Sequence, residues 1–98
     1  MVSRSNIERD LRDLMMIPGL CGYEGRVRGH IKNLLRSEGL ETRTDRLVNL
    51  IMSLSGNDEL PSVMLFTHMD QLGFVVRKIE DDGFVRVERV GGVPERAL

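Results

Sequence analysis

The hydrophobic periodicity of the sequence changes once, near Gly39, and this change most restricts the folds open to the chain. Before it, apolar residues recur at helical spacing in two stripes. The first stripe contains Ile7, Leu11, Leu14 and Met15. The second contains Val27, Ile31, Leu34 and Leu35. Because Pro18 forbids continuation of the first stripe and Gly39 is a natural helix terminator, we predict a helix at about residues 6–16 and a second helix ending before Gly39.

After Gly39 the pattern is that of β-strands. We predict strands at residues 40–44, 47–54, 63–66, 74–79 and 84–90. The segment 63–66 consists of four consecutive apolar residues, which suits a strand buried on both faces. Asp81, Asp82 and Gly83 form a hairpin-turn signal before the last strand. Two helices followed by about five strands predict an α/β fold.

Length and charge exclude several classes of function. The 98 residues suffice for one small domain or for part of a larger one. The 14 basic and 15 acidic residues nearly cancel and are interleaved, so we expect no nucleic-acid partner. No stretch approaches the ~20 apolar residues of a membrane span, so we expect no membrane partner. The single cysteine, Cys21, fits a reducing compartment, and we expect the cytoplasm.

The residues most suited to chemistry are His68 and Asp70, which follow the apolar segment 63–66. Sites in open α/β sheets gather at the carboxyl ends of strands. A histidine that binds a divalent metal usually donates its other ring N–H to a carboxylate, and residues two apart on an extended chain lie on the same side. The pattern therefore indicates a metal ligand, His68, oriented by Asp70. A histidine that only hydrogen-bonds to backbone at a strand end fits the local pattern equally well.

Three separated segments resemble one known family. The stretch THMDQLGFVVRKIEDDGFVRVERVGG is similar to a segment in which HMDE is followed by an apolar residue, glycine and phenylalanine, then a strand, a glycine turn and VGG. PGLCGYEGRVRGHI resembles PG-x-SGYE-x-x-VR, and DRLVNLI resembles DRLGNLI. In this order, and over about residues 11–98, the matches resemble the glutamyl, deblocking and tetrahedral aminopeptidase family.

The resemblance implies an α/β/α metallopeptidase catalytic domain with an inserted smaller β domain. Residues 1–72 would then be the amino-terminal part of the catalytic domain, and residues 73–98 the strands leading toward the insertion. The implied activity is removal of amino-terminal residues from peptide substrates with two divalent metal ions, zinc or cobalt, in a homo-oligomer. His68 matches the first metal ligand, and Asp70 matches the catalytic carboxylate that supports it. The family's other ligands and its general base lie beyond Leu98, so we expect the chain alone to be inactive.

The sequence departs from the family pattern at three positions. Gln71 stands in place of glutamate, Cys21 in place of serine, and Val48 in place of the glycine before Asn49. The first change replaces a carboxylate with a neutral amide beside His68. The last would strain the backbone if the position requires a positive φ.

Other interpretations remain open. The chain is alternatively a non-catalytic, stand-alone binding or interaction module that keeps the scaffold, or an open-frame product with no separate role. The second histidine, His30, has Arg28 and Lys32 nearby and indicates a solvated helix face rather than a site.

Overall fold

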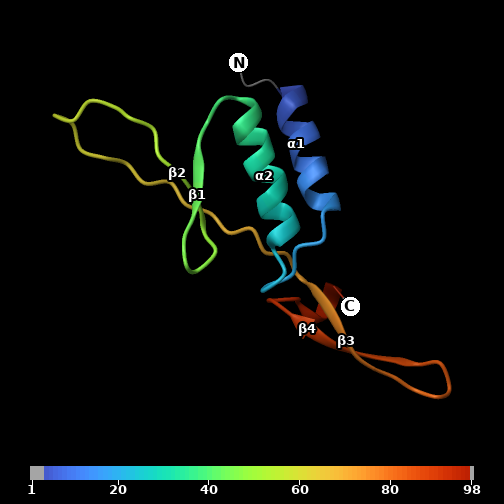
Figure 1. Cartoon of the computed structure of the whole chain (residues 1–98). Helices are drawn as coiled ribbons and strands as arrows, with labels where there is room; N and C mark the ends of the chain where they lie inside the picture. The colour runs from blue at the N-terminus through green and yellow to red at the C-terminus, as the bar shows by residue number, and fades with distance from the viewer. Residues whose placement is uncertain (1–3, 98) are drawn as a thin grey trace.

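The computed structural model describes residues 4–97 as two helices followed by two separate two-stranded sheets (Figure 1). Helix α1 spans Arg4–Met16 and helix α2 spans Gly25–Ser37. Both predicted helices are confirmed, and α1 begins two residues earlier than predicted. Helix α2 ends as expected, because Gly39 adopts a φ of 74° and its N–H donates to the Arg36 carbonyl at 3.0 Å.

Each sheet is a pair of antiparallel strands. Strand β1 (Thr42–Thr44) pairs with β2 (Leu50–Met52). Strand β3 (Gly73–Ile79) pairs with β4 (Val85–Val90) in the predicted hairpin, with a register irregularity between Val76 and Lys78. A short 3₁₀-helix, Glu95–Ala97, follows. Helices and strands together give the expected α/β character.

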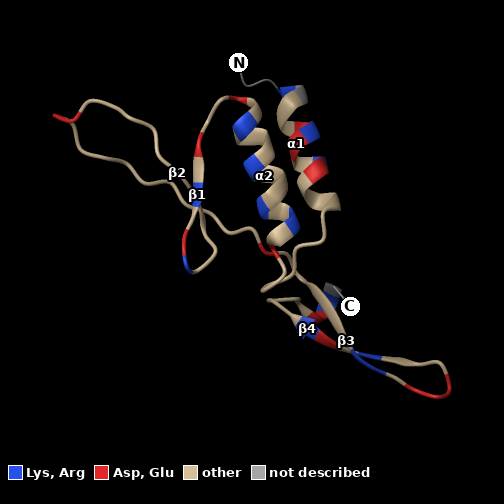
Figure 2. Ribbon diagram, in the orientation of Figure 1, with Lys and Arg blue, Asp and Glu red and all other residues tan. Residues whose placement is uncertain are grey.

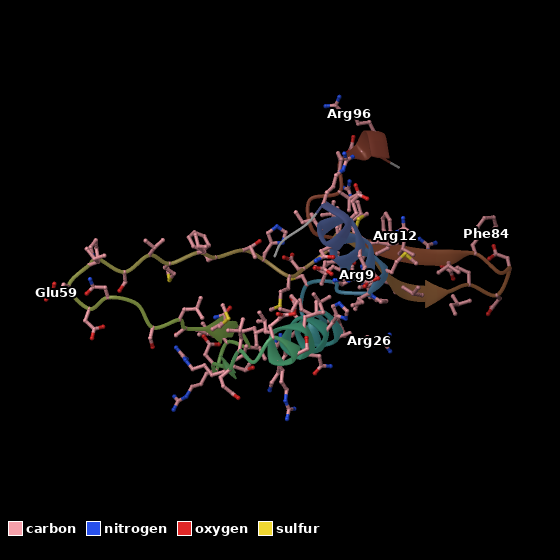
Figure 3. The ribbon with its side chains drawn as sticks, turned by 90° about the horizontal axis from the view of Figure 1, so that it is seen from above. Arg9, Arg12, Arg26, Glu59, Phe84 and Arg96 are labelled. Carbon is pink, nitrogen blue, oxygen red and sulfur yellow. The ribbon has the colours of Figure 1, made fainter. Side chains whose placement is uncertain are left out.

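The prediction of a buried strand at residues 63–66 is wrong. These residues have no strand assignment, and they are 81–92% exposed. They lie in a long projecting loop that has Glu59 at its far end (Figure 3). A strand needs a neighbour to pair its backbone N–H and C=O groups, and none of the strands described between residues 4 and 97 pairs with this segment. The apolar residues 63–66 therefore indicate a tendency to be buried, but they do not determine which strand would pair with them.

The packed core of the described chain is small. Among its hydrophobic side chains, Val27 on α2 is the one that is buried, at 4% exposure. The Cα radius of gyration is 18.1 Å, whereas a compact domain of this length has about 13 Å. The elongated outline of Figure 1, with its projecting loop and the β3–β4 hairpin beyond the helices, agrees with that value.

Charges of both signs are spread over α1 and the β3–β4 hairpin, whereas the charged residues of α2 are all basic (Figure 2). Opposite charges on the hairpin are paired: Glu80 accepts from both Lys78 and Arg86. None of the helices in the described part of the chain has the length and apolar character needed to cross a membrane.

Candidate functional site

His68 and Asp70 form the contact that the sequence predicts. His68 Nδ1 lies 2.9 Å from Asp70 Oδ1 and 3.2 Å from the Asp70 carbonyl oxygen. Both neighbours of Nδ1 are acceptor oxygens, so Nδ1 donates to them when it carries the ring proton. This tautomer leaves Nε2 with its lone pair free to bind a ligand. The imidazole is 83% exposed and the Asp70 side chain 38% exposed, so the pair is accessible.

Gln71 joins this pair to the rest of the molecule. Its backbone N–H donates to the Gly19 carbonyl at 2.7 Å, and Leu20 and Gln71 form an isolated parallel bridge. Its side-chain Nε2 donates to the Leu14 carbonyl in the last turn of α1, at 3.1 Å. The segment that carries His68 and Asp70 is therefore held against the end of α1 and the loop that follows it.

Two glycines near this segment lie against neighbouring side chains. A Cβ at Gly19 would lie 2.6 Å from Val27 Cγ2 and 3.6 Å from the Met69 carbonyl oxygen. A Cβ at Gly73 would lie 2.4 Å from Leu20 Cδ2. A larger residue at Gly19 or at Gly73 would therefore require the Val27 or the Leu20 side chain to move.

A largely apolar hollow of about 280 Å³ adjoins His68. It lies between the two helices and the segment that carries the pair. Its lining residues are Leu14, Met15, Val27, Ile31, Thr67, His68, Met69 and Gln71. The imidazole therefore has water on one side and an apolar wall on the other.

The described residues fit part of a metal centre. Within residues 4–97, no group of three or more His, Cys, Asp and Glu side chains is gathered as a metal site would require. A catalytic zinc site uses about three protein ligands. His68 can supply one ligand through Nε2, with Asp70 fixing the imidazole, and the other ligands would have to come from elsewhere.

The DRLVNLI motif builds a turn rather than a part of this site. Asp45 Oδ1 accepts from the backbone N–H groups of Leu47 and Asn49, each at 2.9 Å, and Asp45 Oδ2 accepts from Asn49 Nδ2. The Asn49 side chain, followed by its backbone N–H, holds the pKa of Asp45 below its ordinary value. Val48 has a φ of 65°, and Arg28 Nε donates to its carbonyl at 2.7 Å, which ties the turn to α2.

The interpretation of His30 as part of a solvated face is met only in part, because the residue is half-buried. Its Nε2 is buried, and no hydrogen-bond partner for it lies in the described part of the chain. Residue 30 follows buried Val27 by three positions, and residues three apart share a helix face. Cys21 is a free and exposed thiol.

The role of Gln71 was missed by sequence reasoning. The sequence indicated only a lost charge at this position. Its hydrogen-bond partner, Leu14, lies 57 residues away, so no local pattern could have found the contact.

Comparison with known proteins agrees with the motifs. The sequence profile of the M42 glutamyl aminopeptidases matches residues 48–98, a range that includes both site residues. Lysyl aminopeptidase of Pyrococcus furiosus is 34% identical over 89 residues, which are 90% of this chain and 25% of that protein. The Escherichia coli protein SgcX is 36% identical over 88 residues, 89% of this chain and 24% of its own length. Glutamyl aminopeptidase of Lactococcus lactis subsp. cremoris is 32% identical over 83 residues, 84% of this chain and 23% of that protein. The chain thus spans about a quarter of the length of these relatives.

Proposed function

Because the chain belongs to the M42 glutamyl aminopeptidase family, we propose that it forms the amino-terminal part of a metal-dependent aminopeptidase that removes amino-terminal residues from peptides. The observation that carries the proposal is the contact between His68 Nδ1 and Asp70 Oδ1 at 2.9 Å. It leaves an accessible imidazole in the tautomer that a metal ligand requires.

In the proposed site the two residues have different roles. His68 offers the Nε2 lone pair as a ligand, and Asp70 accepts the Nδ1 proton, which fixes both the tautomer and the plane of the ring. Two divalent ions, zinc or cobalt, would supply polarisation of the scissile carbonyl and activation of water. The general base and the further ligands belong to parts of the enzyme outside this chain.

The proposal extends to the organisation of the enzyme. Residues 1–72 form the beginning of the catalytic domain, and residues 73–98 lead toward an inserted smaller β domain in an α/β/α architecture. The separation of the β3–β4 sheet from the β1–β2 sheet supports this division. The enzyme acts as a homo-oligomer in the cytoplasm, a compartment that suits the free thiol of Cys21.

Two substitutions in a full-length enzyme containing this sequence test the site. His68→Ala should lower metal content and activity together, and Asp70→Asn should weaken metal binding by about 10- to 100-fold through loss of orientation. Asp58→Asn makes the same chemical change in the exposed loop and is the matched control. Metal content is measured by elemental analysis, and activity with an aminoacyl chromogenic substrate. Wild-type metal content in both variants would reject the assigned roles.

The 98-residue chain provides a second test. We expect it to have no aminopeptidase activity with any added divalent ion, because a single histidine and its supporting carboxylate do not complete a two-metal site. Metal-dependent cleavage that survives controls for contaminating peptidase would contradict this expectation.

A further inference from the structure

The side chain of Gln71 meets the end of α1 in a way that depends on its being an amide. Leu14 is in the last turn of α1, where carbonyl groups lack partners within the helix. Its carbonyl oxygen accepts from the backbone N–H of Ile17 at 3.3 Å and from Gln71 Nε2 at 3.1 Å. Gln71 therefore supplies a second donor to an oxygen with two lone pairs.

A carboxylate could not make this contact. Glutamate at position 71 would place an acceptor against the Leu14 carbonyl, at the negative end of the α1 dipole. It would have to turn away, and the hydrogen bond would be lost. The contact is therefore specific to the amide and not merely to the size of the side chain.

The segment 67–72, which carries His68 and Asp70, has few hydrogen bonds to the rest of the described chain. Among the described residues, the hydrogen bonds that join the segment 67–72 to other parts of the chain are made by Gln71. The immediately preceding residue is Asp70, whose carboxylate holds the exposed imidazole of His68. A change in the path of the chain at Gln71 thus moves Asp70 directly.

We propose that Gln71 is a positioning residue, which fixes the His68–Asp70 pair against α1 through its amide donor. That this pair serves metal-dependent catalysis rests on the function proposed above. The positioning itself rests on the contacts of Gln71 alone.

The test compares two variants that both lose the amide donor. Gln71→Glu keeps the shape of the side chain and adds a negative charge, whereas Gln71→Met keeps the length and adds no charge. Asn33→Asp on the exposed side of α2 repeats the amide-to-carboxylate change away from the site. Ring ¹⁵N NMR of a labelled, metal-free full-length enzyme containing this sequence, recorded at about pH 8, reports the tautomer of each imidazole. His30 serves as the internal reference.

We expect wild-type His68 to be in the Nδ1–H tautomer. Both Gln71 variants should shift it toward the Nε2–H tautomer, which free histidine prefers, while His30 and the Asn33→Asp chain stay unchanged. Amide hydrogen exchange of residues 67–72 should accelerate by about 2- to 10-fold, the range produced by loss of one ordinary hydrogen bond.

Three results would overturn the proposal. They are an unchanged His68 tautomer in both variants, a loss of global stability with no change of tautomer, and unfolding of both variants. If only Gln71→Glu unfolds, the tautomer in Gln71→Met decides. A tautomer shift combined with unchanged metal content in full-length His68→Ala would support the positioning while rejecting the proposed function. An unchanged tautomer in the Gln71 variants, combined with loss of metal in His68→Ala, would reject the positioning role and support the proposed function.

Discussion

At the scale of single residues, Val48 carries backbone strain, as its replacement of the family's glycine led us to expect. The family pattern has glycine at this position, and Val48 adopts a φ of 65°, in the left-handed region that β-branched residues avoid. The left-handed conformation costs a non-glycine residue roughly 1–2 kcal/mol. The side chain is 50% exposed, so little packing would be lost on its removal.

We therefore expect Val48→Gly to stabilise the chain. The relief of strain is reduced by the roughly 0.5–1 kcal/mol of conformational entropy that glycine loses on folding, which leaves a net gain of about 1 kcal/mol. Urea denaturation of a full-length enzyme containing this sequence measures the free energy of unfolding. Leu47→Gly, at an exposed neighbour without positive φ in the same turn, is the control and should not stabilise. A destabilised Val48→Gly chain would show that the valine side chain contributes more than the strain costs.

Asp45 makes the same turn sensitive to acid. Hydrogen bonds from Asn49 and Leu47 lower the pKa of Asp45 below its ordinary value of 3.8. A group whose pKa is lowered by folding stabilises the native state fully above its unfolded pKa, and this contribution is lost as pH falls through the lower, folded pKa. We expect the wild-type chain to be more stable than Asp45→Ala at neutral pH.

The difference between these two chains should close as pH falls below the ordinary range of aspartate. Thermal unfolding of full-length enzymes carrying the two sequences, between about pH 2 and 7, measures it. A difference in midpoint that stays constant down to the lowest pH would show that Asp45 stabilises the turn without its charge.

At the scale of elements, the β3–β4 hairpin depends on its turn. Gly83 has a φ of 89°, and its N–H donates to the Glu80 carbonyl at 3.0 Å. The Glu80 N–H in turn donates to the Phe84 carbonyl at 2.8 Å, which closes the turn. Lys78 and Arg86 both donate to the Glu80 carboxylate and lower its pKa.

We expect Gly83→Ala to loosen the hairpin by about 1–2 kcal/mol, because alanine is strained at this φ. Amide hydrogen exchange of the β3 and β4 backbone measures the local stability. Gly92→Ala is the matched control, since residue 92 has no positive φ and an added Cβ there would meet open space. Equal exchange in the two variants would contradict the assigned role of the turn.

At the scale of the whole molecule, apolar surface remains uncovered. Three residues of the apolar stripe on α1, Ile7, Leu11 and Met15, are 55–68% exposed. The loop residues 63–66 are more exposed still. Together with the 18.1 Å radius of gyration, this indicates a chain whose helices and strands do not close a core of their own. Exposed apolar patches and unpaired strand edges favour association.

We expect the 98-residue chain to associate or to unfold without a sharp transition. Size-exclusion chromatography with light scattering and thermal unfolding test this. Leu65→Lys, at a 92% exposed position, should reduce association, whereas Ser55→Lys adds the same charge in the same loop without removing apolar surface. A monodisperse wild-type monomer with a cooperative transition would instead favour a stand-alone binding module.

The sequence by itself determined the local features of this protein. Helical spacing and the stops at Pro18 and Gly39 predicted both helices, and alternation around Gly83 predicted the β3–β4 hairpin. The contact of His68 with Asp70 was also predictable, because the two residues are only two positions apart. All of these depend on backbone preferences and on neighbours within a few residues, which a pattern records directly.

Only the tertiary structure decided which distant groups meet. The apolar run at residues 63–66 was predicted as a buried strand, but pairing needs a second segment, and none of the described strands provides it. The burial of His30 Nε2 likewise follows from what surrounds α2. Gln71 donates to Leu14 across 57 residues of sequence, and no local pattern records such a contact. The hydrophobic pattern determines which segments tend to be buried, whereas long-range packing determines which other segment each of them contacts.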